Sequence, residues 1–367
     1  MVRSLAAIFA LCFALFACGG PEIDKNPAPI VWGKITFAPT TVERSRDKTV
    51  YNNISFTGYG KQGMIERVTV EGDETIVENF SSSFYSSKRE VFKNPGGDYK
   101  TAVEWFFSGG FEKAYAKHNF SSTPRYTLGA YEGEDISIKT SNGASTFASA
   151  KAKNIDPRGC EDGEIKNLVI TPQRGYAVNI GSISIGKLFI PDDPDNNPGK
   201  IAIEGLRLDN IIAPQINAKI GKASADFKAP KFSFALDDVS IPGAFFASLD
   251  IPNAPAVVEG SLSGDGQLEG SVLNAKAALT LKDLFDLEAE LRGDIKTDQP
   301  ESIKFVLKET GAFKYITQQQ RAQLAMLSLF VPGAQEALVG FFSKPGQTIS
   351  GSVSFFGNIP EFKFKLK

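Results

Sequence analysis

The chain has very little histidine and lacks the common catalytic loops. His118 is the only histidine among 367 residues, which excludes sites built from several histidines and leaves a histidine-based triad with one candidate base. A GxSxG elbow, a Walker loop and a dinucleotide-binding fingerprint do not occur in the sequence. His118 lies near the expected end of a helix, where a cap or a surface position explains it. The sequence therefore predicts a protein that is not an enzyme.

A surplus of charge of one sign is missing as well. The chain has 40 lysine and arginine residues and 42 aspartate and glutamate residues, for a net charge of −2. Proteins that bind nucleic acid usually carry a clear basic surplus. The balance of charge therefore gives no support to a nucleic-acid partner.

Long apolar runs are missing except at the N-terminus, in MVRSLAAIFALCFALFA. This run opens with Arg3 and continues through an apolar stretch from Leu5 to Phe16, which is shorter than the ~20 residues that a membrane-spanning helix needs. A positive charge followed by an apolar core of this size is typical of a signal peptide. We therefore predict a signal peptide over residues 1–17 and an exported mature chain.

The end of that run, LFACGG at residues 15–20, resembles the lipobox of bacterial lipoproteins. In that family a small residue, here Ala17, precedes a cysteine whose thiol receives diacylglycerol and becomes the first residue of the mature chain. The resemblance implies lipid attachment at Cys18, and Gly19 is compatible with transfer to the outer membrane, facing the periplasm. Each buried methylene contributes about 0.8 kcal/mol, so two or three acyl chains hold such a protein on the bilayer. A secreted protein with a cysteine in its signal peptide is the alternative.

Cysteine is scarce in the rest of the chain. Of the three cysteines, Cys12 leaves with the signal peptide and Cys18 would carry lipid. Cys160 is then alone, which excludes an internal disulfide. We expect a buried structural thiol at Cys160; a reactive or intermolecular thiol is the alternative.

Proline and glycine mark the expected divisions of the mature chain. Residues 18–29 comprise the lipidated cysteine and GGPEIDKNPAP, which is polar, interrupted by proline and expected to be an extended tether. We predict an N-terminal β-rich region with one helix at residues 30–157. A C-terminal antiparallel β region is expected at residues 158–367, because the Pro-Arg-Gly sequence at 157–159 favours a boundary.

Alternation of apolar and polar residues dominates the folded part. It is clear in residues 277–291, which predict a hairpin with a turn near 282–286, and at 362–367, where apolar residues alternate with lysines. Similar alternation recurs through most of the second half. We therefore predict a mainly β protein, with an antiparallel curved sheet or a sandwich of hairpins.

Helical periodicity is confined to two stretches. Residues 100–118 place apolar residues on one helical stripe that Gly109-Gly110 weakens. Residues 317–343 predict a helical pair, with Thr317 as the first cap and Pro332-Gly333 as the break. We expect the pair to cover one end or one face of the sheet with its apolar side chains in the core; contact with a membrane is the alternative.

The body of the chain also resembles a family of periplasmic proteins. The hairpin rhythm of residues 158–367, strands that begin with Gly-Leu such as Gly205-Leu206, and the late helical pair are similar to the AsmA and YdgA-like type. In those proteins repeated hairpins form long curved sheets with an apolar trough for lipid. Most of them carry a spanning N-terminal helix, where this chain has the LFAC sequence.

One loop has the spacing of a calcium site. Asp193, Asp195, Asn197 and Glu204 take the first, third, fifth and twelfth positions of an EF-hand loop. The sixth position, which needs glycine, is Pro198, and the flanks favour strands over helices. Calcium is therefore the only metal cofactor that the sequence suggests, and an ordinary loop between strands explains the same residues.

Three functions from different classes remain open. The anchor, the β-rich body and the 29 phenylalanines favour an envelope lipoprotein that binds lipid or another apolar ligand in a β-sheet groove. A structural lipoprotein that presents a β platform to an envelope protein partner is the alternative. An exported hydrolase with a carboxylate site is the third, and no motif favours it.

Overall fold

The structure is a computed structural model of the chain. It describes residues 22–109, 124–191, 201–244, 255–294, 299–315, 335–341, 343–356 and 359–367. The chain divides into two compact units, unit 1 at residues 1–161 and unit 2 at residues 162–367. The described residues are mainly antiparallel strands, which confirms the predicted fold class.

Unit 1 is a sheet whose later strands pair in chain order. Most neighbours are joined by short turns, and β8 also pairs with β10. Its strands are β1 (Glu22–Asp24), β2 (Ile30–Trp32), β3 (Ile35–Ala38), β4 (Thr41–Arg44), β5 (Lys48–Gly58), β6 (Lys61–Glu71), β7 (Glu74–Ser82), β8 (Tyr85–Lys93), β9 (Gly96–Gly97), β10 (Tyr126–Thr140) and β11 (Gly143–Asp156).

The folded part begins earlier than the sequence suggests. Strand β1 lies within the stretch expected to be a tether, and its Glu22 pairs with Arg44 of β4. Asp24 forms an ion pair with Arg44 at 3.9 Å and accepts a hydrogen bond from the Asn26 backbone N–H at 3.0 Å. These polar contacts hold residues 22–26 in place although the segment has few apolar side chains to bury. A search for apolar periodicity therefore does not find it.

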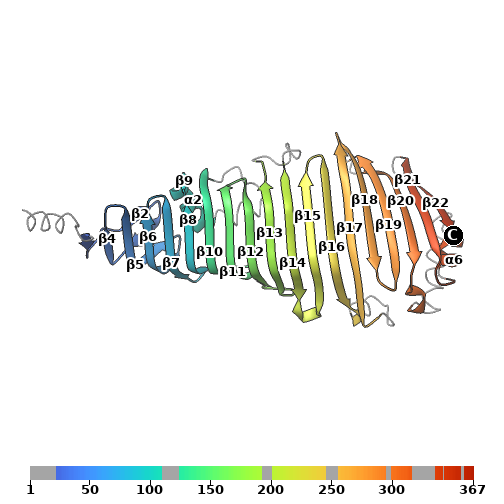
Figure 1. Cartoon of the computed structure of the whole chain (residues 1–367), viewed down its shortest axis with the longest axis horizontal. Helices are drawn as coiled ribbons and strands as arrows, with labels where there is room; N and C mark the ends of the chain where they lie inside the picture. The colour runs from blue at the N-terminus through green and yellow to red at the C-terminus, as the bar shows by residue number, and fades with distance from the viewer. Residues whose placement is uncertain are drawn as a thin grey trace, which may run out of the picture. The chain divides into compact units, whose positions relative to one another are not determined.

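Unit 2 is a meander. Strand β12 (Gly159–Pro172) contains the division between the units, and from β13 onward each strand pairs with the next (Figure 1). The strands are β13 (Val178–Phe189), β14 (Ala202–Ala213), β15 (Ala218–Lys228), β16 (Lys231–Pro242), β17 (Val257–Glu269), β18 (Val272–Leu281), β19 (Phe285–Asp294), β20 (Gln299–Glu309), β21 (Thr348–Phe356) and β22 (Ile359–Leu366). The predicted hairpin at 277–291 is confirmed as β18 and β19.

Helices are few and short in the part of the chain described. Helix α2 (Tyr99–Phe107) confirms the first half of the helix predicted at 100–118, and α6 (Gln335–Phe341) confirms the second helix of the pair predicted at 317–343. Residues 110–118, with His118, and residues 317–334 lie outside the described residues. Single 3-10 turns follow β14 (η2, Pro214–Ile216) and β20 (η3, Ala312–Lys314). None of the helices described is long and apolar enough to cross a membrane.

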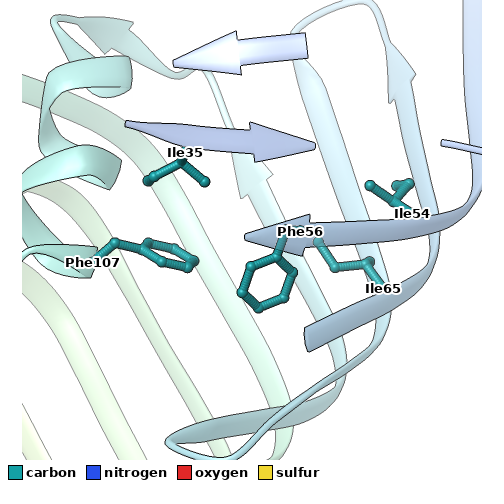
Figure 2. Packing of buried hydrophobic residues seen from close by; sticks show 5 residues of the cluster. All are labelled: Ile35, Ile54, Phe56, Ile65 and Phe107. Atoms are coloured by element: carbon teal, nitrogen blue, oxygen red, sulfur yellow. The ribbon is translucent and has the colours of Figure 1, made fainter. Parts of the chain in front are cut away.

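Unit 1 has a compact apolar core between its sheet and α2. Phe107 of α2 and Phe56 of β5 meet edge to face, with ring centroids 5.4 Å apart, and Ile35, Ile54 and Ile65 complete the buried cluster (Figure 2). Edge-to-face pairs add about 0.5–1.5 kcal/mol to the burial of apolar area. The helix therefore docks through its C-terminal aromatic residue.

Several strands contain an asparagine or aspartate in the left-handed backbone region. In unit 2, Asn210 (φ 52°) on β14 and Asp238 (φ 54°) on β16 are examples. They face Gly181 and Gly221 of the neighbouring strands, and the regular pairing skips these positions. In unit 1, Asn53, Asn79 and Asp135 have the same conformation within strands. Short polar side chains tolerate this region better than other non-glycine residues.

These left-handed residues change the face of the sheet on which the following side chains of the strand lie. On β16, Leu236 and Val239 are three positions apart, which in a regular strand places them on opposite faces. They pair with Leu262 and Gly260 of β17, two positions apart, with a register shift between the pairs. Cross-strand partners share a face, so Leu236 and Val239 lie on the same face. The chain thus keeps apolar residues with a spacing of three on one side of the sheet.

A substitution at Asn210 tests this role. Asn210→Val should lower the free energy of unfolding by about 1–2 kcal/mol, because a β-branched residue is strained at positive φ. Asn210→Gly should leave it within about 1 kcal/mol of the parent, because glycine accepts this conformation. Urea unfolding of the two variants measures the difference, and equal stability would contradict the assigned role.

Candidate ligand-binding face

One face of unit 2 has two neighbouring apolar rows, the longer of which runs from β13 to β22. A single cross-strand row contains only aliphatic side chains, from β13 to β22: Ile183, Leu208, Ala223, Leu236, Leu262, Leu279, Leu287, Leu307, Ile349 and Leu366. The next row on the same face runs Leu206, Ala225, Phe234, Gly264, Ala277, Ala289, Phe305, Gly351 and Phe364. We call the surface formed by these two rows the apolar face.

Phenylalanine and glycine are paired across strands on the apolar face. A Cβ atom on Gly264 would lie 2.6 Å from Cζ of Phe234, and a Cβ on Gly351 would also collide with the ring of Phe305. Each ring therefore lies over the backbone of the neighbouring strand instead of standing upright. Such pairs shield the glycine backbone and keep the face low. They also account for part of the large number of phenylalanines, which the sequence alone does not explain.

Most of the apolar face is only half-buried. Side chains from β14 to β19 in both rows have intermediate exposure, whereas Ile349 of β21 is 1% exposed. Helix α6 makes the difference, because Ala337 and Phe341 pack with Ile349 and against Phe305, Leu307 and Phe364. The helix covers the face at β21 and β22.

A buried carboxylate holds the turns that flank α6. Glu309, at the end of β20, is 2% exposed. Its Oε1 accepts a hydrogen bond from the Phe313 backbone N–H at 2.8 Å, and its Oε2 accepts one from the Gly346 N–H at 2.6 Å. One side chain therefore joins the two ends of the segment that leads into and out of the helix.

The opposite face of unit 2 is polar. A row across it places Asp265, Lys276, Glu290 and Lys304 side by side on β17 to β20, and Lys276 and Glu290 form an ion pair at 3.0 Å. The ammonium group lowers the pKa of Glu290, and the carboxylate raises the pKa of Lys276. Hollows of about 730 and 550 Å³ are lined mainly by side chains of this face. Charged side chains of both signs contribute to the lining of these hollows.

Unit 1 contains a buried acid. Glu90 of β8 is 5% exposed and accepts a hydrogen bond from the Tyr85 hydroxyl group. Burial raises the pKa of Glu90, although hydrogen bonds from hydroxyl groups, that of Tyr85 first, act in the opposite direction. Burial also raises the pKa of Tyr85 and of Tyr131. The sequence gives no sign of this group, because Glu90 lies between Arg89 and Val91 in a strand of mixed polar and apolar residues.

The raised pKa of Glu90 predicts a pH-dependent stability. Below the ordinary glutamate pKa, Glu90 is protonated in both the folded and the unfolded chain. As the pH rises from the ordinary pKa to the raised pKa of the folded chain, Glu90 ionises more readily in the unfolded chain. The free energy of unfolding therefore falls over this range of pH. A tenfold difference between the two ionisation constants corresponds to about 1.4 kcal/mol. Glu90→Gln should therefore raise the free energy of unfolding at about pH 8 by about 1 kcal/mol or more, and leave it nearly unchanged at about pH 4.

Urea unfolding at the two pH values measures this effect. Glu132→Gln is the control, because Glu132 lies on the adjacent strand and is exposed. A Glu90→Gln variant that follows the pH profile of the parent protein would contradict the assignment.

Several residues singled out in the sequence lie outside the described part of the chain. These are Cys18, Asp193, Asp195 and Asn197, so the lipid site and the calcium site stay predictions. Glu204 is described: it lies on β14 and forms an ion pair with Lys228 of β15 at 3.3 Å. Among the described residues no group of acids, cysteines or histidines could hold a metal ion.

Cys160 lies at the start of β12 and is half-buried. Burial, and then the nearby Glu161, raise the pKa of its thiol. A raised pKa favours the protonated thiol, which is a weak nucleophile; the role of Cys160 stays a prediction.

Comparisons with known proteins add no relative: no family model, no curated protein and no solved structure matches the chain.

Proposed function

We propose that the chain is a membrane-anchored envelope lipoprotein that binds lipid or another apolar ligand on the apolar face of unit 2. The observation that carries this proposal is the pair of cross-strand rows with no charged side chain, half-exposed from β14 to β19. Contiguous exposed apolar surfaces of this kind are uncommon in soluble proteins unless something binds them. The anchor rests on the LFAC sequence at residues 15–18.

The form of the apolar face favours acyl chains over a second protein layer. Protein layers interlock through side chains that fill one another's gaps. Here Phe234 and Phe305 lie flat over glycine, and Ala277 and Ala289 lie between them. This row is therefore low between β16 and β20, and it lies beside the row of leucines on the same face. A low strip along a row of aliphatic side chains gives narrow, flexible hydrocarbon chains continuous contact and offers little for another sheet to interlock with.

The polar face supports the second candidate, a platform for an envelope protein. Its row of alternating charges on β17 to β20 and its hollows, which charged side chains help to line, are features that a complementary charged partner can recognise. The apolar face would then be a surface that another part of the assembly covers.

Extraction of the purified chain separates the two candidates. Protein exported with a cleavable signal and starting at residue 22, so that it carries no anchor, should retain acyl lipid that organic solvent releases for mass spectrometry. A clean spectrum from folded protein would contradict the lipid proposal and favour the platform.

The anchor has its own test. Cys18→Ser should prevent lipid attachment, and the chain should keep residues 1–17 because cleavage in lipoproteins follows the modification. The control is Cys160→Ser, which should be processed normally. Intact-mass measurement of membrane fractions reads both outcomes, and a Cys18→Ser chain that matures and stays on membranes would contradict the anchor.

A further inference from the structure

The predicted lipid site is very close to the folded part of unit 1. Cys18 precedes Glu22, the first residue of β1, by four positions. A fully extended chain spans at most about 3.6 Å per residue, so Glu22 lies within about 14 Å of the lipidated cysteine. A tether through residue 29 would have allowed about three times this distance. Strand β1 therefore removes most of the freedom that a longer tether gives.

The direction of β1 determines which end of the sheet is near the anchor. Glu22 pairs with Arg44 and Asp24 pairs with Val42, and β4 leads from Arg44 into the turn at residues 45–47. The chain therefore enters β1 from the end of the sheet that carries this turn. The turns at residues 59–60 and 141–142 lie at the other end, beyond the ~34 Å that the ten steps of β5 span at about 3.4 Å per residue.

The end near the anchor has nearly balanced charge. Arg44 pairs with Asp24, Lys48 with Glu71 at 3.5 Å, and Lys93 with Glu74 at 3.5 Å. Basic residues at a surface attract anionic lipids by about 1 kcal/mol each, and here neighbouring carboxylates offset that attraction. Ile23 of β1, 53% exposed, adds an apolar side chain on this side.

We propose that unit 1 stands on the bilayer, with the turn at residues 45–47 against the lipid surface and the turns at 59–60 and 141–142 directed away from it. The partner surface is the bilayer itself, contacted because of the short anchor and independently of lipid charge. The inference rests on the proposed anchor at Cys18.

Quenching by lipid measures this orientation in the full lipidated chain. Arg46→Cys and Asn142→Cys are each made in a Cys160→Ser background, labelled with a fluorophore and reconstituted in phosphatidylcholine vesicles that carry brominated acyl chains. Both positions are exposed. Quenching at position 46 should be several-fold greater than at position 142, and adding phosphatidylglycerol to the vesicles should leave the ratio unchanged.

A spacer variant provides the matched control. A Gly-Ser insert of ~20 residues after Gly20 has a root-mean-square span of about 25 Å, and it should reduce quenching at position 46 towards the value at position 142. The orientation would be overturned by equal quenching at the two positions. It would also be overturned if the spacer left the quenching at position 46 unchanged. Intact mass reports lipidation independently: a chain without lipid at Cys18 overturns the anchor, whereas a lipidated chain with equal quenching overturns the orientation alone.

Discussion

Glu309→Ala is expected to lower the free energy of unfolding by about 3–6 kcal/mol, because the side chain accepts two backbone hydrogen bonds and each bond to a charged group contributes about 1.5–3 kcal/mol. The alanine variant leaves the N–H groups of Phe313 and Gly346 without their present acceptor. Urea unfolding of the full chain measures the change.

Glu309→Gln is the matched variant. Glutamine keeps the length of the side chain and one carbonyl oxygen, so it can replace one of the two acceptors. Its loss of stability should therefore be about half that of alanine. If the glutamine and alanine variants lost equal stability, or if neither lost any, Glu309 would not be what joins the two turns beside α6.

The sequence predicts the class of fold well where alternation is regular. Residues 277–281 and 287–291 have regular period two on either side of a turn, and they form the predicted hairpin of β18 and β19. Burial of one face is sufficient to specify such strands, because a slip by one residue would expose every apolar side chain.

Strands with a left-handed residue hide their alternation. Leu208 and Ile211 on β14 are separated by three positions, a spacing closer to the helical period than to the strand period. The reason is Asn210, whose positive φ resets the face of the strand. An asparagine or aspartate between apolar residues three positions apart is therefore a usable signal for such strands.

The candidate site is less visible in the sequence than the fold. No pattern identifies Glu90 or Glu309 as buried, because the sequence of a strand with mixed residues does not show which of its polar side chains loses contact with solvent. The pairing of phenylalanine with glycine depends on register between strands, such as Phe234 with Gly264, and register is not readable from either strand alone. The sequence could thus predict that the sheet has an apolar face, but not that phenylalanine rings lie over glycines on it.

Ala277→Lys is expected to reduce the lipid retained per protein by about tenfold or more, because tenfold corresponds to 1.4 kcal/mol and an unpaired ammonium in hydrocarbon costs more than that. Ala277 lies in the middle of the apolar face, between Gly264 of β17 and Ala289 of β19. The side chain of lysine cannot reach water at either end of the strand from this position, although lysines near an edge can do so. Quantitative mass spectrometry of extracted lipid measures the result.

Two variants separate charge at this site from other effects. Ala278→Lys places the same side chain one position along β18 on the polar face, opposite Glu288, and should retain lipid as the parent chain does. Ala277→Leu adds bulk without charge and should also retain it. Because Ala277 is only half-buried, the sheet can accommodate a lysine at this position without rearranging. Urea unfolding verifies that the variant is folded. If Ala277→Lys and Ala278→Lys kept equal amounts of lipid, acyl chains would not occupy the apolar face, and the charged row on the polar face would become the better candidate for recognition.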